Sequence, residues 1–418
     1  MFETIRIKNF RTHIDTSINL SDLTLVIGAN NSGKSNLLAG ISHFAKLVSR
    51  AYPGNKRDKT ISYNDFFPHR HSLCDEKEPM SFYCSWKKDI YHFEYDLVLI
   101  PDVRKILCKE KLKISDNREF THGYDLNSSE ILLRTKISEQ GIGKELLSVI
   151  EIFFRSLSFA FYYNLQPSFL NGTGIPFKYN HSLQDFTSAS HTNFCQQYEE
   201  QGKRPNIAIG LGEQGYNFQE LIKYVTKHDD HTYGRFRGYL QRFVKSFNGI
   251  IIERSGVKWQ FDMGENNFPY YDAEKVSDGL LKAGAVALLC SMKTPPSVIM
   301  LEEVENGINQ KNLKEFLAWL KATSHLNATQ FILTSHSPSV IREFNKNLND
   351  VYSVVLKEKN RYESKITNLN DALNPLVDIG AVNEDAIIGY KEKDGKKIVQ
   401  IRAYELTELF YNGVLGNL

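Results

Sequence analysis

The chain opens with two different patterns of apolar and polar positions. Residues 2–10 and 14–20 alternate between apolar and polar side chains, which predicts an antiparallel pair of strands joined by a turn. Residues 23–27 are continuously apolar and rich in β-branched side chains, as expected of a buried parallel strand. Residues 37–48 carry apolar side chains at helical spacing. The N-terminal region is therefore predicted to run from a hairpin into a buried strand and then into a helix.

The segment between this strand and this helix has the spacing G-x-x-x-x-G-K-S. A strand before it and a helix after it are the context that distinguishes a P-loop from a chance glycine loop. Its glycines let successive backbone N–H groups point at phosphate oxygens, and the positive end of the helix adds to that field. The lysine would reach the β- and γ-phosphates and the serine hydroxyl would bind Mg²⁺. The predicted triphosphate-binding residues are Gly28, Asn30, Asn31, Ser32, Gly33, Lys34, Ser35 and Asn36.

A meander of antiparallel strands is predicted after a polar loop at residues 52–58. Turn residues separate these runs, so they would form an extra sheet beside the P-loop sheet. The predicted strands are 81–86, 91–100, 105–114 and 130–137. A basic cluster lies along the third strand. Its alternation favours a solvated face, with contact to a phosphate backbone as the alternative. The cluster consists of Arg104, Lys105, Lys109, Lys111 and Lys113.

The middle of the chain carries mixed signals. Residues 145–164 begin with helical spacing and end with strand-like content, and residues 172–193 predict a long loop. His181 and His191 lie in that loop without the spacing of metal ligands. Two helices are predicted at 216–225 and 233–247, followed by a hairpin at 250–253 and 258–263. The second helix carries basic residues among aromatics, which favours a solvated face over nucleic-acid contact; they are Arg235, Arg237, Arg242 and Lys245.

Two further apolar strands end in residues suited to phosphate chemistry. Residues 297–301 lead directly into Glu302 and Glu303, where one carboxylate can hold Mg²⁺ and the next can orient the attacking water. Residues 329–334 form a second strand, which is followed after Ser335 by His336. A histidine at the end of such a strand would sit over the γ-phosphate. Each feature alone is commonplace, and the P-loop is what makes the functional interpretation the stronger one.

Ser277-Asp278-Gly279 opens a long apolar helix. Serine or aspartate at this position is an ordinary N-cap, because it accepts hydrogen bonds from free backbone N–H groups. The same N–H groups can also meet the γ-phosphate of a nucleotide bound to a second subunit. Both roles are compatible.

In this order, the motifs resemble those of ABC-type ATPases of the SMC/RecF/OLD lineage. The resemblance is closest to bacterial AAA-like ATPases with the pattern S-D-G, then E-E-x-E-N-G-I, then T-S-H-S-P. Here these motifs are residues 277–279, 302–308 and 334–338. Residues 7–11, which include Arg11, resemble the first strand of the family, and residues 404–416 resemble its C-terminal tail. The middle, from about residue 51 to residue 270, is similar only loosely.

The resemblance implies an α/β P-loop NTPase fold with a mostly parallel core sheet, an antiparallel β subdomain and a helical lobe. It also implies a homodimer or higher homo-oligomer in which the P-loop of one subunit faces the S-D-G motif of another around ATP and Mg²⁺. By the same resemblance, Glu303 is the catalytic carboxylate and His336 the γ-phosphate sensor. Glu302 would bind Mg²⁺ with Ser35, and Arg11 would contact the nucleotide. Three departures are Glu302 in place of the usual Asp, Val304 in place of a common Pro, and a Q-loop glutamine for which Gln166 is a candidate.

The domain plan expected from these features is a single ATPase domain over residues 1–418. Its parts are the P-loop half (1–50), an antiparallel β insertion (51–140), a helical lobe with loops (141–270), the half with the S-D-G, E-E and histidine motifs (271–360), and a C-terminal tail (361–418).

Composition narrows the class of protein further. Lys and Arg total 51 and Asp and Glu 49, so the net charge of +2 does not by itself announce a nucleic-acid partner. Five scattered cysteines suggest neither disulfides nor a zinc site, which fits a reducing cytoplasm. No apolar run approaches the ~18 residues of a spanning helix, and the N-terminus has no signal-peptide core, so no membrane association is expected.

The functional hypotheses follow from what accompanies the ATPase motifs. No Toprim nuclease like that of the OLD branch is recognisable after Pro338, so the chain resembles ATPase sensor subunits of bacterial anti-phage defence systems, which control a separately encoded effector protein. One alternative is a DNA-repair or recombination ATPase that clamps DNA. Another is a slowly hydrolysing, nucleotide-gated scaffold. A transporter subunit is disfavoured by the S-D-G motif, and a GTPase by the lack of an N-K-x-D motif.

Overall fold

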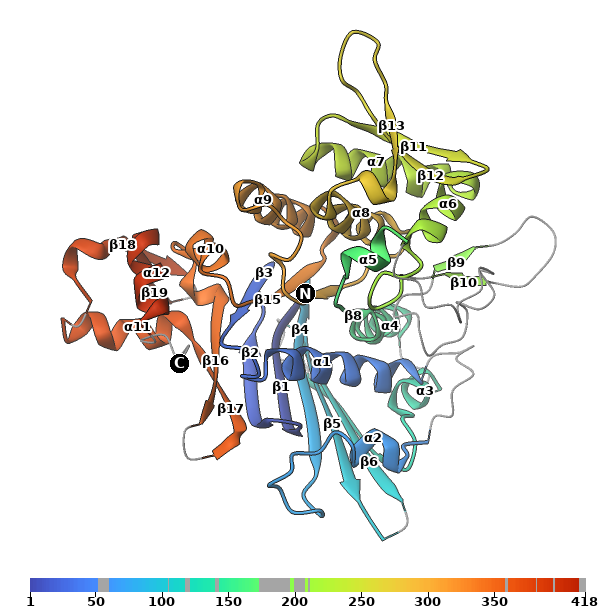
Figure 1. The fold of residues 1–418 in the computed structure, drawn as a ribbon. Helices are drawn as coiled ribbons and strands as arrows, with labels where there is room; N and C mark the ends of the chain where they lie inside the picture. The colour runs from blue at the N-terminus through green and yellow to red at the C-terminus, as the bar shows by residue number, and fades with distance from the viewer. Residues whose placement is uncertain are drawn as a thin grey trace. The chain divides into compact units, whose positions relative to one another are not determined.

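In the computed structural model, whose ribbon is drawn in Figure 1, the chain divides into two compact units. The first comprises Met1–Ala160 and Ile332–Leu418, and the second is Phe161–Phe331. The expected loop at 52–58, together with Arg104, His181, His191 and the end of the C-terminal tail, lies outside the described residues. The described ranges are 1–51, 60–103, 105–116, 121–139, 143–172, 196–198, 207–209, 211–357, 360–380, 382–393 and 395–412.

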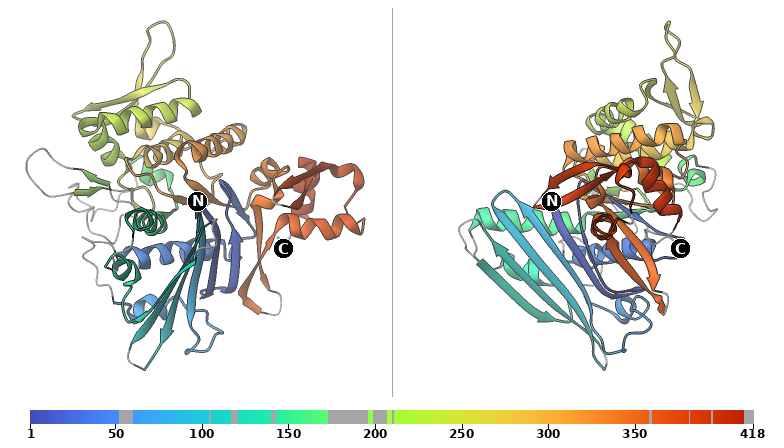
Figure 2. Two further views of the ribbon diagram at one scale, coloured as in Figure 1. Left: turned by 180° about the vertical axis from the view of Figure 1, so that it is seen from behind. Right: turned by 90° about the vertical axis from the view of Figure 1, so that its left-hand side faces the viewer.

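The first unit contains a six-stranded antiparallel sheet with the order β2-β1-β4-β5-β6-β7. Its strands lie side by side in Figure 2, coloured from blue to green. The alternating N-terminal pair is confirmed, and it is part of this sheet rather than of the P-loop sheet. The strands are β1 (Phe2–Phe10), β2 (His13–Asn19), β4 (Met80–Lys88), β5 (Tyr91–Pro101), β6 (Ile106–Ser115) and β7 (Thr121–Ser128).

One predicted strand of the meander is wrong. Residues 130–137 do not form a strand, because helix α3 (Leu133–Ser138) occupies most of this range, and the last strand of the sheet is β7 instead. The buried carboxylate of Glu110 on β6 accepts hydrogen bonds from the backbone N–H groups of Leu132 and Leu133 at 2.8 and 3.0 Å. These are N–H groups that a helix leaves without partners at its start. A distant side chain therefore stabilises a helix in a sequence that looks strand-like.

The second sheet of the first unit carries the P-loop. The continuously apolar strand β3 (Leu23–Ile27) is buried at every position and pairs in parallel with β16 (Val351–Lys357). On the other side of β16 lies the antiparallel strand β17 (Asn360–Asn368), and β15 (Gln330–Ser335) follows β3 in the strand order. The buried parallel strand predicted before the P-loop and the buried strand predicted before His336 are therefore confirmed.

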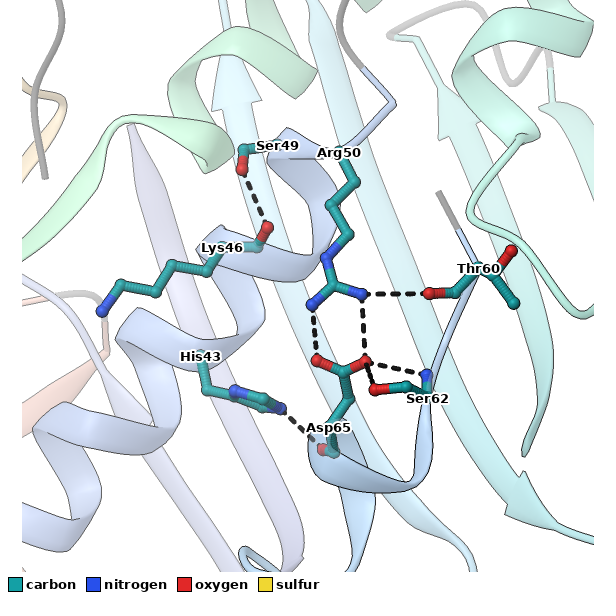
Figure 3. Close-up of polar contacts among 7 residues, drawn as sticks. All are labelled: His43, Lys46, Ser49, Arg50, Thr60, Ser62 and Asp65. Carbon is teal, nitrogen blue, oxygen red and sulfur yellow. Dashed lines mark hydrogen bonds and ion pairs between the residues drawn. The ribbon is translucent and has the colours of Figure 1, made fainter. Parts of the chain in front are cut away.

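Helix α1 (Lys34–Ser49) begins directly at the P-loop and lies close to β1. A Cβ atom added at Gly40 would come within 2.8 Å of Ile7 and 3.2 Å of Phe10, so this glycine permits close packing. At the far end of the helix, Arg50 forms a two-point ion pair with Asp65 of α2 (Tyr63–Phe66), as Figure 3 shows. Helix α4 (Lys144–Ser158) covers the aromatic face of the antiparallel sheet, where Phe153 stacks on Phe93 with ring centroids 5.0 Å apart.

The C-terminal part of the first unit follows β17 and forms a small group of elements. Asn370, in α11, bonds to the main chain of β19 through both its amide oxygen and its amide nitrogen, at 2.9 and 3.0 Å. The elements are α10 (Pro338–Ile341), α11 (Leu369–Asp378), β18 (Ile387–Lys393), β19 (Lys396–Ile401) and α12 (Ala403–Tyr411).

The second unit is mostly helical and is built around α8 (Asp278–Ser291). Gly284 lets α8 approach Trp259, because an added Cβ would lie 2.9 Å from that ring. The predicted hairpin is confirmed as β11 (Phe247–Glu253) and β12 (Gly256–Phe261). The other elements used below are α6 (Phe218–His228), α7 (Asp230–Phe243), α9 (Gln310–Asn327), β8 (Ala160–Tyr163) and β14 (Val298–Leu301). No helix within the described residues is long and apolar enough to cross a membrane.

Candidate functional site

The P-loop adopts a backbone that only glycine and asparagine accept readily. Gly28 and Gly33 have φ angles of 153° and 110°, and Asn31 has a φ of 62°. Space restricts both glycines as well. A Cβ added at Gly28 would lie 2.3 Å from the carbonyl oxygen of Val354 on β16, and one added at Gly33 would lie 2.1 Å from Ser364 Oγ on β17. The hairpin β16–β17 therefore contacts the P-loop closely.

The side chain of Lys34 binds the backbone of the P-loop itself. Its Nζ donates hydrogen bonds to the carbonyl oxygens of Gly28 and Ala29, both at 2.8 Å, and the residue is buried. Ala29, Asn30, Asn31 and Ser35 are exposed beside it. A positive charge, an exposed serine and a backbone that requires glycine thus meet at the start of α1, which is the arrangement that binds phosphate.

Arg11 lies in the turn between β1 and β2, yet it is close to the predicted loop residues. Its guanidinium donates to Asn36 Oδ1 at 3.3 Å and stands over the Phe10 ring, 5.4 Å from its centroid. The structure therefore brings Arg11 and Asn36 together. Arg11 has a φ of 49°, a turn conformation that is uncommon for a residue with a side chain.

Three residues that sequence reasoning missed also contact the P-loop, namely Thr12, His13 and Ser364. His13 is fully buried, and this burial lowers its pKa to about 4. The ring is therefore neutral near pH 7. Its Nε2–H donates to the Gly33 carbonyl at 3.0 Å and Nδ1 accepts from the Thr16 hydroxyl at 2.9 Å. His13 and Thr12 adjoin Arg11 in the sequence, whereas nothing in the sequence around Ser364 connects it with the loop.

His336 follows β15, the strand next to β3, and is exposed. The turn after it is ordered by serine side chains, since Ser335 Oγ accepts from the N–H of Ser337 at 2.9 Å and Ser337 caps α10. His336 therefore stands at the end of a strand adjacent to the one that leads into the P-loop.

The second unit carries the remaining predicted residues. Glu302 and Glu303 directly follow β14, and Glu303 has a φ of 45°, a strained backbone conformation for a residue other than glycine. The Tyr162 hydroxyl donates to the carboxylate of Glu302, and the side-chain amide of Asn306 donates to that of Glu303. Both carboxylates are therefore oriented by neighbours within this unit.

Lys282 of α8 binds the loop that contains Glu303. Its Nζ donates to the carbonyl oxygens of Glu303, Val304 and Asn306 at 2.8, 3.1 and 3.1 Å, and the residue is only 2 % exposed. Burial lowers the pKa of Lys282 to about 8, against the opposing influence of the nearby glutamates. Sequence reasoning treated this lysine as part of an apolar helix. A cation among its apolar residues is the signal that could have singled it out.

The S-D-G motif forms the start of α8, as predicted. Ser277 is the N-cap, and its Oγ accepts from the N–H of Leu280 at 3.4 Å. Gly279 and Gly307 allow this turn to pack against the Glu303 loop, because an added Cβ at Gly279 would lie 3.1 Å from the Gly307 carbonyl oxygen. Ser277 and Asp278 remain exposed. The predicted residues thus form two groups: the P-loop, Arg11 and His336 in the first unit, and the S-D-G motif, Glu302 and Glu303 in the second.

The two predicted basic clusters differ in their surroundings. The lysines of β6 lie beside carboxylates on both neighbouring strands, since Lys111 is opposite Asp96 and Asp125 in the strand register, and Lys113 lies 3.4 Å from Glu94. This mixed-charge face supports the solvated interpretation. On α7, by contrast, Arg237 and Arg242 are exposed, and the chain carries no carboxylate from residue 231 to residue 252.

Comparison with known families agrees with the geometry. The model of a family described as "AAA domain, putative AbiEii toxin, Type IV TA system" matches residues 23–342. The chain belongs to this AAA domain family. Membership confirms the predicted ATPase-type P-loop domain and implies that this AAA domain binds a nucleotide. No curated protein matches the sequence.

The AAA domain is also similar, distantly, to solved SMC head domains. The SMC head domain from Thermotoga maritima shares 14 % identity at a TM-score of 0.41, covering 88 % of this chain and 98 % of the other. An SmcHead bound to the C-winged helix domain of ScpA shares 12 % identity at a TM-score of 0.45, covering 88 % and 96 %. An Smc head domain bound to the C-terminal domain of ScpA, derived from Pyrococcus furiosus, shares 12 % identity at 0.39, covering 90 % and 99 %. Similarity this distant adds nothing to the interpretation of the site.

Proposed function

We propose that the protein binds ATP with Mg²⁺, hydrolyses it within an assembly of two or more copies, and acts as a switch that controls a separately encoded effector in anti-phage defence. The observation that carries the ATPase part is the P-loop geometry. Lys34, the positive-φ glycines and the start of α1 combine charge, N–H groups and an exposed Ser35. The defence part is supported by the description of the matching family, which refers to toxin–antitoxin systems.

The chemistry of Ser35 and Glu302 supports their assignment as Mg²⁺ ligands. This ion prefers hard oxygen ligands, and the exposed residue Ser35 carries a hydroxyl while Glu302 carries a carboxylate directly after a strand. When bound, Mg²⁺ supplies charge neutralisation at the phosphates. Glutamate in place of the usual aspartate lengthens the reach to the metal by one methylene.

Other residues of this chain would act on the attacking water and on the γ-phosphate. Glu303 orients the attacking water and accepts its proton, and His336 donates a hydrogen bond to the γ-phosphate. Ser277, Asp278 and Gly279 of a second copy present the free N–H groups at the start of α8 to the same phosphate. This role agrees with the exposure of Ser277 and Asp278.

The proposal is tested with Glu303→Gln, which keeps the size of the side chain and removes the base. ATP turnover and native mass are measured for the wild type and the variant. We expect turnover to fall by roughly a hundredfold or more while ATP binding persists and an ATP-bound assembly accumulates. Glu305→Gln, in the same loop, is the matched control. Equal turnover of wild type and Glu303→Gln would overturn the assignment, and slow turnover by both would favour a nucleotide-gated scaffold.

The defence role has a separate test in cells. Protection against phage is measured with the neighbouring genes present and with them deleted. We expect protection to require both this protein and a neighbour that encodes the effector. Protection by the ATPase alone would contradict the proposed control of a separate effector.

A DNA-clamping ATPase is the second candidate, and the exposed face of α7 is the observation that favours it. Arg237 and Arg242 of α7 are exposed, as is Lys245 shortly after the helix, and α7 carries no carboxylate after its first turn. Duplex binding through these groups predicts affinity that falls linearly with salt on a double-logarithmic scale, and turnover that DNA stimulates. Unchanged turnover with DNA and a flat salt dependence would exclude this function.

A further inference from the structure

Two carbonyl groups of the P-loop are hydrogen-bonded by side chains that lie outside the motif. The carbonyl oxygen of Ser32 accepts from Ser364 Oγ of β17 at 2.7 Å. The next carbonyl oxygen, of Gly33, accepts from His13 Nε2 of β2 at 3.0 Å, in addition to the first helical bond from the N–H of Leu37. Both donors are buried, with exposed fractions of 4 % for Ser364 and 0 % for His13.

Peptide geometry gives these two bonds a consequence inside the loop. A trans peptide is planar, so its C=O and the N–H of the following residue point in opposite directions. A bond that fixes the Ser32 carbonyl therefore fixes the N–H of Gly33, and a bond that fixes the Gly33 carbonyl fixes the N–H of Lys34. With both carbonyls held by outside partners, both N–H groups are directed away from those partners. They belong to the set that binds phosphate in a P-loop.

The donor on β17 is itself part of a directed chain of hydrogen bonds. Asn36 Nδ2 donates to Thr12 Oγ1 at 3.1 Å, and Thr12 Oγ1 lies 2.8 Å from Ser364 Oγ. A carbonyl oxygen only accepts, so the single hydroxyl proton of Ser364 goes to Ser32 and Ser364 accepts from Thr12. The backbone N–H of Ser364 also donates to the Thr12 carbonyl at 2.7 Å.

A second anchor holds β17 two residues earlier. His71 Nδ1 accepts from the N–H of Leu73 at 3.1 Å, so the proton is on Nε2, which donates to the Tyr362 carbonyl at 2.9 Å. Ser364 is thus held directly by Thr12, and its strand is held two residues earlier by His71. The absence of a side chain at Gly33 is part of the arrangement, since a Cβ there would collide with Ser364 Oγ and lie 2.8 Å from Thr12 Oγ1.

We infer that Thr12, His13 and Ser364 form a carbonyl clamp that holds the N–H groups of Gly33 and Lys34 in the direction needed to bind phosphate. The inference deepens the proposed function, because it rests on nucleotide binding at the P-loop. The three residues are positioning residues: they touch the loop from outside and act on the nucleotide through its backbone. Loss of the clamp weakens phosphate binding in the ground state and the transition state alike.

The test compares Ser364→Ala and Thr12→Val with the wild-type protein, using titrations with ATP, ADP and inorganic pyrophosphate. One lost hydrogen bond of ordinary strength predicts affinity that is weaker by roughly three- to tenfold for each of the three ligands. Because binding in the ground state and the transition state is weakened equally, KM rises and kcat stays close to wild type. Thr12→Ser, which keeps the hydroxyl, should retain wild-type affinity.

Thr367→Ala is the matched control on the same strand, and unfolding curves show that each variant is folded under the binding conditions. The clamp is refuted if folded Ser364→Ala and Thr12→Val bind all three ligands as tightly as Thr367→Ala. It is also refuted if kcat falls while the affinities stay unchanged. A wild-type protein that does not bind ATP would instead refute the proposed function, so the two failures are distinguishable.

Discussion

Several buried donor side chains in this protein bind backbone carbonyl groups of the loops that carry candidate site residues. Lys34 holds the P-loop, His13 holds its last carbonyl, and Lys282 holds the Glu303 loop. Irregular backbone lacks the regular partners of helices and strands, and unsatisfied buried carbonyls are costly. Each of these side chains stabilises one conformation of a loop that would otherwise have several.

Lys282 provides a direct prediction at this scale. Lys282→Met keeps most of the apolar length of the side chain but leaves three carbonyl oxygens without their donor. We expect the free energy of unfolding to fall by about 1–3 kcal/mol. Turnover should fall more than ATP affinity, because the loop that positions Glu303 loses its support. Urea unfolding and steady-state kinetics measure the two effects.

The matched control is Lys275→Met, an exposed lysine shortly before α8. Wild-type turnover in Lys282→Met would show that the loop keeps its conformation without the lysine.

His13 predicts a pH dependence of stability. Its pKa is about 4 in the folded protein and 6.5 ordinarily, so between these values the unfolded chain takes up a proton that the folded chain does not. Stability therefore decreases as pH falls through this window. The histidine contributes a loss of roughly 2 kcal/mol between about pH 7 and pH 5.

Urea unfolding of the wild type and of His13→Gln at both pH values measures this contribution. Other histidines with lowered pKa values, such as His43, contribute equally to both proteins and cancel in the difference. Identical pH slopes would mean that His13 is not the responsible group.

At the scale of elements, the start and the end of α1 are held by different means. The P-loop and its contacts fix the start, and Arg50 at the end is bound by Asp65, with bonds of 2.5 and 3.0 Å (Figure 3). Asp65 also accepts from the N–H and the hydroxyl of Ser62, both at 2.8 Å. Burial alone would raise the pKa of Asp65, and the hydrogen bonds from Arg50 and Ser62 outweigh it and lower the pKa.

Asp65→Ala should therefore destabilise the protein. It leaves the guanidinium of Arg50, whose side chain is 16 % exposed, without its carboxylate, and removes the hydrogen bonds that Asp65 accepts from the N-cap residue Ser62 of α2. We expect a loss of roughly 2–4 kcal/mol in the free energy of unfolding, measured by chemical denaturation.

Glu76→Gln removes an exposed partner of Arg70 and serves as the comparison, with an expected change below about 1 kcal/mol. A similar small change for Asp65→Ala would show that the buried pair contributes no more than a surface pair.

At the scale of the whole molecule, one chain carries the P-loop group and the S-D-G group in different compact units. In the proposed assembly each nucleotide is bound by the P-loop of one copy and the S-D-G motif of another. A cyclic or two-fold arrangement makes every site a product of two subunits. Inactivating one group in one copy therefore leaves the other group of that copy usable.

Mixing two inactive variants tests this arrangement. Lys34→Ala removes the P-loop charge and Ser277→Arg blocks the S-D-G turn, so each variant alone should have little turnover. If they assemble randomly as dimers, half of the dimers are mixed and each has one intact site, which predicts roughly a quarter of wild-type turnover. Mixtures as inactive as the separate variants would show that each site is built within one copy.

The sequence predicted those parts of the fold and site whose signals are local. The strand at residues 23–27, the P-loop and the Ser277 cap were found because each is specified by neighbours within a few residues. The helix α3 was mistaken for a strand because its cap, Glu110, lies 22 residues away. Ser364 was missed for the same reason, since 332 residues separate it from its partner Ser32. Contacts of this kind arise only from the folded topology.

The hairpin β16–β17 has a mechanical consequence for the P-loop. Strand β17 ends at Asn368, which caps α11, and Asn370 of that helix is tied to the main chain of β19. An unbroken line of hydrogen bonds and covalent chain thus runs from the C-terminal elements, red in Figure 1, to the carbonyl of Ser32. These bonds connect β18–β19 with Ser364, the residue that orients the P-loop. The C-terminal elements are therefore part of the scaffold that holds the P-loop, although they lie far from it in the sequence.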